Sequence, residues 1–222
     1  SRLRRNDGAE YWVIASATPI IDDRHEFLGS FAMLTDITER HQREAFQLEF
    51  ARKTIEAATA GKLLIRTPEE IQQLAGALLI HQPIARVDDL EVIRHAVAAA
   101  ARAAGMEEER IFDFTLCISE AATNALKHAG GGTFSLQRFD DSLLAVVADQ
   151  GPGILAINLP EVALKAGYST AVSLGMGYKA MISMTDHVYL ATGPAGTTVA
   201  IAMAMHTPTT APITVPELPG DW

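Results

Sequence analysis

Apolar and polar positions along the chain follow two kinds of pattern, one typical of strands and one typical of helices. Two runs rich in aliphatic and aromatic residues, 10–17 and 27–34, flank the polar turn 22–25, a pattern that predicts a β-hairpin. Across 39–60, apolar residues recur at three- and four-residue spacing among charges of both signs. This pattern predicts a helix that Gly61 ends.

The next stretch, 61–84, opens with a short predicted strand. Thr67, Pro68 and Glu70 then mark a strong helix start. A threonine N-cap accepts a backbone N–H from the third helical residue, and a glutamate at that position reaches back to the N-cap. We predict a helix from Pro68 that turns its apolar side inward and ends near Pro83. We interpret 61–84 as a small adaptor.

Two long helical patterns follow. The first runs from residue 87 to Gly105, with Asp88 or Asp89 as its cap, and the second continues to Ala129. The remaining predicted elements are strands at about 132–139 and 143–149, a helix at about 175–185, and strands at 187–192 and 197–205. Together they predict an α+β sandwich with a mixed, mainly antiparallel sheet and helices on one face.

Composition narrows the classes of function. The 222 residues are 48% hydrophobic, which supports a buried core, and the net charge of −9 argues against a nucleic-acid partner. The single cysteine, Cys117, excludes an intramolecular disulfide and suits a reducing cytoplasm. No apolar run approaches the roughly 20 residues of a membrane span, and no signal peptide follows Ser1. We expect a cytoplasmic fragment of a longer protein.

Candidate chemistry is concentrated on the second long helix. Glu120, Asn124 and His128 recur every fourth residue, so a helix places them on one face about one turn apart. An amide oxygen is a hard ligand suited to magnesium, and a carboxylate accepts a proton. An ordinary amphipathic helix with a polar edge would show a similar stripe.

Glycine-rich turns follow this helix. The apolar run 143–148 leads into Asp149, Gly151 and Gly153. Gly175 and Gly177 then open another helical pattern, and Thr197 and Thr198 lie in a strand-like run. In this order, the four pieces resemble the N box, the two glycine boxes and the closing threonine of the GHKL ATP-binding superfamily, over roughly residues 86–205.

The resemblance implies a GHKL-type α/β sandwich that binds ATP and Mg²⁺. It implies that Asn124 is the magnesium ligand, that Glu120 is the base, and that Asp149 accepts a hydrogen bond from the adenine amino group. Gly151 and Gly153 let the backbone approach the base. The remaining implied contacts are Gly175 and Gly177 at the lid, His128 near the triphosphate, Thr197 or Thr198 near the adenine edge, and lid contacts from Lys179, Ser169 and Thr170.

Within the superfamily, the pattern is most similar to the bacterial anti-sigma-factor serine/threonine kinases. This similarity implies a protein substrate of the anti-anti-sigma type, with a response regulator, a sigma factor and a homodimer as further partner possibilities. An atypical sensor histidine kinase and a non-catalytic nucleotide-binding regulator stay open. Neither His41 nor His81 fits the box that surrounds a phosphoaccepting histidine.

The first 40 residues resemble the last strands of a PAS sensor domain, through Trp12 and the closing string D-I-T-E-R at 36–40. Because the similarity covers only the C-terminal part of such a domain, we expect no bound signal molecule. The predicted organisation is therefore the end of a PAS domain at 1–40, a signalling linker helix at 41–60, the adaptor at 61–84, an ATP-binding kinase domain at 85–206 and a flexible tail at 207–222.

Overall fold

The chain forms two units, Ser1–Lys53 and Thr54–Trp222, which we describe separately. The structure is a computed structural model of the 222-residue chain. It describes residues 2–4, 8, 10–23, 25–74, 76–160 and 177–207. Three predicted lid residues, Gly175, Ser169 and Thr170, and nearly all of the predicted tail lie outside the described residues.

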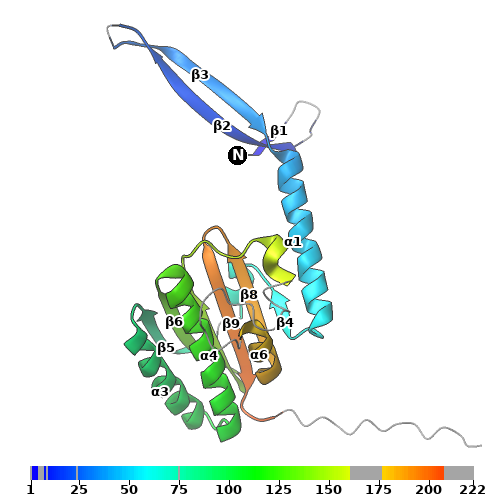
Figure 1. The fold of residues 1–222 in the computed structure, drawn as a ribbon, viewed down its shortest axis with the longest axis vertical. Helices are drawn as coiled ribbons and strands as arrows, with labels where there is room; N and C mark the ends of the chain where they lie inside the picture. Colours follow the sequence, from blue (N-terminus) through cyan, green and yellow to red (C-terminus); the bar gives the residue numbers. More distant parts are fainter. Residues whose placement is uncertain are drawn as a thin grey trace, which may run out of the picture. The chain divides into compact units, whose positions relative to one another are not determined.

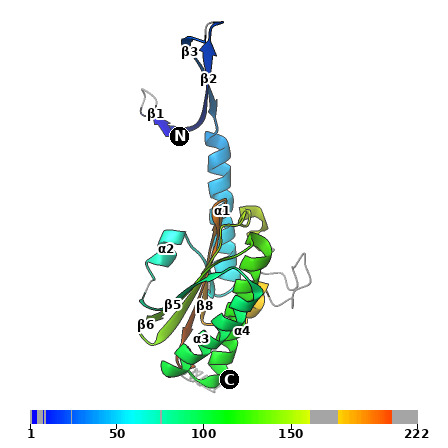
Figure 2. The same ribbon diagram turned by 90° about the vertical axis from the view of Figure 1, so that its left-hand side faces the viewer.

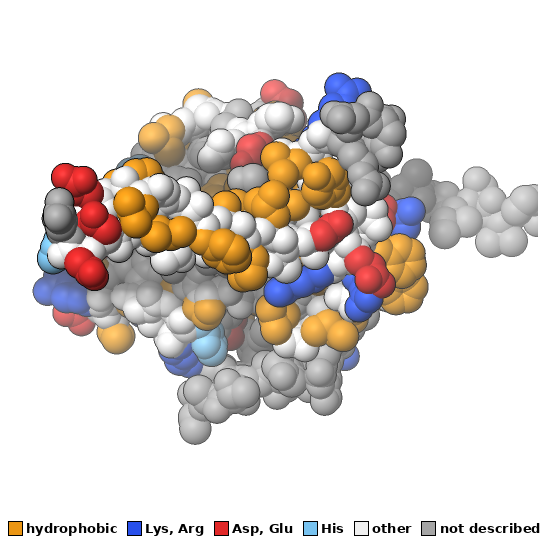
Figure 3. Space-filling view, turned by 90° about the horizontal axis from the view of Figure 1, so that it is seen from above, with side chains coloured by type: hydrophobic (Ala, Val, Ile, Leu, Met, Phe, Trp, Pro, Cys, Tyr) orange, Lys and Arg blue, Asp and Glu red, His pale blue; other side chains and the backbone are white. Residues whose placement is uncertain are grey.

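The first unit contains the predicted hairpin. Its strands are β1 (Arg2–Arg4), β2 (Glu10–Ile21) and β3 (Phe27–Asp36), in the order β1-β2-β3, and they lead into α1 (Thr38–Ala58). In the antiparallel β2–β3 register, Ile14 lies opposite Thr35 and Thr18 opposite Phe31. Large apolar side chains are exposed along the hairpin (Figure 3): Ile14, Ile20, Ile21, Phe27, Leu28, Phe31, Met33 and Leu34.

The hairpin joins α1 through a set of local contacts. The backbone N–H of Trp12 donates to Thr38 Oγ1 at 2.8 Å, and the Ile37 N–H donates to the Trp12 carbonyl at 2.8 Å. The indole of Trp12 stacks on the imidazole of His41, with ring centroids 4.2 Å apart and planes within 7°. The first turn of α1 is therefore held directly by β2.

The second unit is built on a six-stranded sheet in the order β4-β8-β9-β7-β6-β5 (Figure 1). Its strands are β4 (Leu63–Ile65), β5 (Ala77–Ile84), β6 (Gly132–Phe139), β7 (Ser142–Ala148), β8 (His187–Gly193) and β9 (Gly196–Ala204). Only the β4–β8 pair is parallel among these strands. The predicted mixed, mainly antiparallel sheet is confirmed.

Helices α3 (Val87–Ala103), α4 (Glu108–Ala129) and α6 (Gly177–Met184) cover one face of the sheet (Figure 2). Strand alternation supplies the apolar side chains that pack beneath them. The fully buried residues of this layer include Ile93, Val97, Phe114, Ile118, Phe134, Leu136, Leu143 and Leu190.

The opposite face carries the short helix α2 (Pro68–Gln72), as Figure 2 shows. Ile71 of α2 packs there with Leu144, Ala191 and Ala200. The predicted cap is present, because Glu70 donates its N–H to Thr67 Oγ1 at 3.2 Å and accepts from the Thr67 N–H at 2.7 Å. A 3-10 helix, η1 (Ala156–Asn158), follows β7.

The predicted length of the Pro68 helix is wrong. The helix ends at Gln72, and the sequence expected to complete it forms the edge strand β5, antiparallel to β6. The apolar residues of 77–84 follow no long helical repeat, and pairing with β6 satisfies their backbone. Pro83 is compatible with this place, because an edge strand tolerates a missing N–H donor.

The cap of α3 also differs from the prediction. Arg86 is the N-cap residue, and the Asp89 carboxylate accepts the N–H groups of Ala85 and Arg86, each at 2.8 Å. These bonds lower the pKa of Asp89. Gly105 follows the helix with φ of 90°, as predicted for a residue that ends it. Across the described residues, no helix has the length and apolar character of a membrane span.

Candidate functional site

Asp149 lies just beyond the end of β7, and backbone donors hold its carboxylate. Asp149 Oδ1 accepts the N–H of Gly151 at 2.8 Å and that of Thr197 at 3.1 Å, while its own N–H donates to the Thr197 carbonyl at 2.8 Å. Among the described residues, Oδ2 accepts no hydrogen bond. The carboxylate is therefore fixed by one oxygen and offers the other to a donor.

Glycines let three backbone segments meet around Asp149. A Cβ on Gly153, where φ is 69°, would lie 2.1 Å from the Gly193 carbonyl oxygen. A Cβ on Gly196, where φ is 131°, would lie 2.0 Å from the Asp149 carbonyl oxygen. Neither distance is compatible with any side chain. The β8–β9 turn is thus packed directly against the turn that follows β7.

The same turn contacts the end of α4. A Cβ on Gly151 would lie 2.8 Å from the Cβ of Ala129, the last residue of that helix. Asn124 lies five residues earlier, about 7–8 Å back along the helix axis. The turn that follows Asp149 is therefore packed against the C-terminal end of α4, the helix that carries Asn124.

Thr197, and not Thr198, makes the contacts to Asp149. Thr197 Oγ1 also lies 3.2 Å from Thr192 Oγ1, and Thr192 accepts the Ile154 N–H at 2.7 Å. Thr198 pairs across the strands with Ala148 and Ala191. Sequence reasoning missed Thr192, although its position opposite Thr197 follows once the β8–β9 hairpin is assigned.

The predicted polar face of α4 is present. Glu120 and Asn124 are half-buried, and His128 is exposed in the last turn, before Gly130 ends the helix with φ of 72°. Within the described residues, none of the three side chains makes a hydrogen bond or an ion pair. Their polar atoms are available to a ligand.

Glu120 also borders a groove of about 350 Å³ between α3 and α4. The hydroxyls of Thr115, Ser119 and Thr123 on its wall each donate to the carbonyl four residues earlier in α4. The groove therefore presents mainly apolar surface beside Glu120. Its other lining residues are Val87, Leu90, Arg94, Phe112 and Leu116.

Gly177 begins α6 with φ of 33°, a conformation that favours glycine. The next residue, Tyr178, is buried, and burial followed by the negative charge of Asp149 raises the pKa of its phenol. Lys179 is exposed. The start of α6 therefore lies within electrostatic range of Asp149.

On α4, burial raises the pKa of Cys117 to about 12, and the charges of Asp113 and Glu120 add to this effect. The thiol therefore stays protonated.

These residues fit a nucleotide better than a protein-held metal alone. The free Oδ2 of Asp149 suits an amine donor, and the close backbone contacts at Gly153 and Gly196 hold the turn that carries this carboxylate. Among the described residues, no cluster of three His, Cys, Asp or Glu side chains is arranged for a metal. A magnesium ion at Asn124 would need ligands from phosphate oxygens and water, which is its usual coordination.

Comparison with known families identifies the domain. The family described as histidine kinase-like ATPase domain matches residues 84–203, more than half of the chain. The chain belongs to this family, which confirms the predicted GHKL resemblance and its α+β fold. No curated protein matches the chain.

Similar solved structures come from two proteins, one of Mycobacterium tuberculosis and one of Erythrobacter litoralis. The RsbU and RsbW domains of Rv1364c from Mycobacterium tuberculosis share 17% identity over 59% of this chain, with a TM-score of 0.42; the chain covers 34% of that protein, about a third of its length. The blue-light activated histidine kinase of Erythrobacter litoralis EL346 shares 18% identity over 92% of this chain and 74% of that one, with a TM-score of 0.35.

The histidine kinase domain of the same Erythrobacter protein shares 19% identity over 75% of this chain and 83% of that one, with a TM-score of 0.34. Likenesses with TM-scores of 0.34 to 0.42 establish no shared activity.

Proposed function

We propose that this chain binds Mg²⁺–ATP and transfers the γ-phosphoryl group to a serine or threonine of a protein partner of the anti-anti-sigma type, under the control of a PAS sensor. The observation that carries the proposal is the Asp149 carboxylate, held by backbone donors through one oxygen and open at the other. Family membership supports ATP as the ligand.

Each residue has a defined role in the proposal. Asp149 selects the adenine amino group, a hydrogen bond to a charged acceptor worth about 1.5–3 kcal/mol. Asn124 holds the magnesium ion that accompanies the phosphates, Gly177 opens the helix facing them, and Glu120 accepts the proton of the attacking hydroxyl. Catalysis of phosphoryl transfer depends mainly on such positioning and charge neutralisation.

A histidine kinase is the alternative, and two observations favour serine or threonine as the acceptor over a histidine within this chain. His81 lies on strand β5, whereas phosphoaccepting histidines of that family lie on helices. His41 lies on α1, but its ring is stacked on Trp12. A third possibility is a regulator that binds nucleotide without transfer.

The test is phosphoryl transfer from γ-labelled ATP to a small anti-anti-sigma-type protein, with acid and base treatment of the product. We expect label on the partner that survives acid, as phosphoserine does. Acid-labile label would instead establish a histidine kinase, and the absence of label despite ATP binding would establish a regulator. The variant Asn124→Ala is the control, because it should transfer no label.

A further inference from the structure

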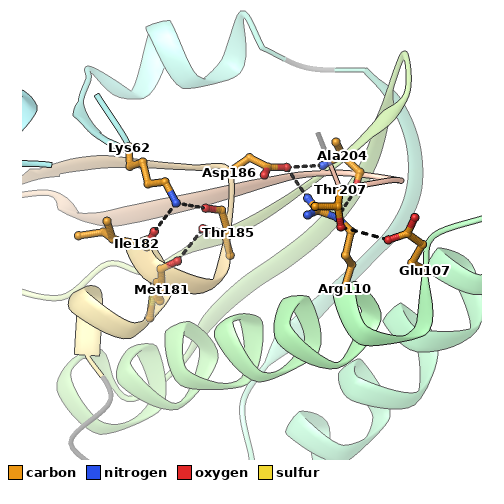
Figure 4. A network of polar contacts seen from close by, with 9 residues as sticks. All are labelled: Lys62, Glu107, Arg110, Met181, Ile182, Thr185, Asp186, Ala204 and Thr207. Atoms are coloured by element: carbon orange, nitrogen blue, oxygen red, sulfur yellow. Dashed lines mark hydrogen bonds and ion pairs between the residues drawn. The ribbon is translucent and has the colours of Figure 1, made fainter. Parts of the chain in front are cut away.

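A second polar network lies at the corner where α6 ends and β8 begins (Figure 4). Thr185 and Asp186 form this corner. Among the described residues, Thr185 is the one polar residue whose side chain is buried. Its hydroxyl donates to the Met181 carbonyl at 2.7 Å. The Thr185 hydroxyl therefore satisfies a carbonyl of the last turn of α6, just before the chain enters β8.

Asp186 ties the corner to two other elements. Its Oδ2 accepts Nη2 of Arg110 at 2.5 Å and the N–H of Ala204 at 2.7 Å. Arg110 also donates from Nε to the Ala204 carbonyl at 2.8 Å. The arginine side chain is only 11% exposed, so solvent and salt screen this ion pair less than a surface pair. Arg110 lies in the first turn of α4, and the proposed site lies at the other end of that helix.

Lys62 reaches the corner from the opposite side. Its Nζ donates to the carbonyls of Ile182 and Thr185, at 3.3 and 3.4 Å (Figure 4). The last carbonyls of a helix lack partners within the helix and carry the negative end of its dipole, so a cation there is stabilising. The Val188 N–H donates to the Lys62 carbonyl at 2.8 Å, which fixes the lysine backbone beside the corner.

The backbone before Lys62 is closely bound to the end of α1. The Lys62 N–H donates to the Thr59 carbonyl at 3.0 Å, and the Gly61 N–H donates to the Glu56 carbonyl at 2.8 Å. Glu56 also pairs with Arg66, at 2.6 Å and with both side chains less than a third exposed. Lys62 is thus the side chain through which the turn after α1 contacts the end of α6.

The far end of α6 lies at the proposed site. Helix α6 has eight residues, Gly177–Met184, which corresponds to about 12 Å of helix. Backbone hydrogen bonds connect the last turn of α6 to its first, so the orientation of the helix depends on how its C-terminal end is held. Both helices that present the proposed nucleotide groups, α4 and α6, are therefore joined at this corner.

We propose that Lys62 is a positioning residue that holds α6 in the orientation needed for nucleotide binding. The inference rests on the proposed function, since it assigns Lys62 to the same nucleotide site. Lys62 does not touch the nucleotide. It acts on the carbonyls of Ile182 and Thr185 at the C-terminal end of α6. The opposite end of this helix carries Gly177 and Tyr178, and Tyr178 is affected by the charge of Asp149.

The test compares Lys62→Met with the wild-type chain and with two controls. Lys62→Arg keeps a cation that reaches the same carbonyls. Lys53→Met removes another exposed lysine, one that pairs with Glu49 of its own helix. ATP affinity is measured by titration. Amide hydrogen exchange of residues 177–186 and the melting temperature are measured without nucleotide.

We expect Lys62→Met to weaken ATP binding and to speed exchange at the end of α6 by about two- to fivefold each, the effect of one cation at a helix C-terminus. The melting temperature should stay close to that of the wild type, and Lys62→Arg should restore both quantities. Lys53→Met should change neither.

Unchanged affinity and exchange in Lys62→Met would overturn the proposal. It would also be overturned if both losses accompanied a fall in melting temperature that Lys62→Arg did not repair, because Lys62 would then serve folding alone. Failure of the proposed function is distinguishable, since the wild-type chain itself would bind no ATP. In that case the exchange of residues 177–186 still decides whether Lys62 holds α6.

Discussion

At the Asp149 end of the site, backbone atoms of three segments are in direct contact, whereas along α4 three polar side chains project without partners among the described residues. Gly153 and Gly196 leave no room for a Cβ at the first region. In the second region, Glu120 and Asn124 are half-buried. The first region is built from backbone contacts that the fold requires. The second consists of side chains on which no hydrogen bond or ion pair among the described residues depends.

In the proposed function, the first region recognises the adenine base, and the second holds the magnesium ion and the general base. A carboxylate fixed by backbone N–H groups is preorganised and needs no rearrangement to bind an amine. Side chains without partners keep rotamer freedom until a ligand orders them. Substitutions that disturb the backbone contacts of the first region should therefore affect folding and binding together, and those in the second should affect only binding or turnover.

The largest effect is expected for Gly153→Ala. The new Cβ would collide with the Gly193 carbonyl, and φ of 69° is strained for alanine. Strain of this kind costs about 1–3 kcal/mol, and overpacking a further 1–3 kcal/mol or so. Urea denaturation should show the combined loss, and ATP binding should fall with it.

Gly105→Ala is the matched control for this variant. Gly105 has φ of 90°, but a Cβ there meets nothing within 4 Å. It should lose only the conformational part, about 1–3 kcal/mol. Equal losses in the two variants would show that the close backbone contact contributes nothing.

Asn124→Ala tests the α4 region. We expect it to abolish the magnesium-dependent part of ATP binding, because the amide oxygen is the proposed metal ligand. The free energy of unfolding should change by no more than about 0.5 kcal/mol, since the side chain has no partner among the described residues. Titrations with ATP in Mg²⁺ and in EDTA provide the measurement. An affinity equal to that of the wild type in Mg²⁺ would remove Asn124 from the site.

Glu120→Gln tests the proposed base. The amide is isosteric and cannot accept the proton, so phosphoryl transfer should fall by about 10²–10⁴-fold, the usual contribution of a general base. ATP affinity should be retained. Single-turnover transfer from labelled ATP and a separate binding titration measure the two quantities. A variant with undiminished transfer would show that Glu120 is not the base.

Asp149→Asn tests the first region with the smallest structural change, because it replaces one carboxylate oxygen with an NH₂ group. The asparagine Oδ1 can still accept the N–H groups of Gly151 and Thr197, so the fold should be kept. The free oxygen becomes an NH₂ group that faces the adenine amine, and we expect a loss of about 1.5–3 kcal/mol in ATP binding. Calorimetric titration with ATP and with GTP measures the loss and its base dependence. Full ATP affinity would place the adenine elsewhere.

Local patterns in the sequence determined most of the secondary structure and much of the candidate site. Glu120, Asn124 and His128 recur every four residues, which predicts that they share one face of a helix, because a helix has 3.6 residues per turn. The apolar run before Asp149 set a buried strand that ends at the carboxylate. Helix periodicity and strand alternation are properties of neighbouring residues, so they are readable before any fold is known.

Only the tertiary structure decided which distant segments meet. A short apolar run such as 77–80 is by itself ambiguous between a helix and a strand, and pairing with β6 made it part of a strand. The choice of Thr197 over Thr198, and the contacts of Gly153 and Gly196 with other turns, depend on strand register. Lys62 contacts residues 120 and more positions away. Such contacts follow from the packing of the whole sheet, which no local pattern contains.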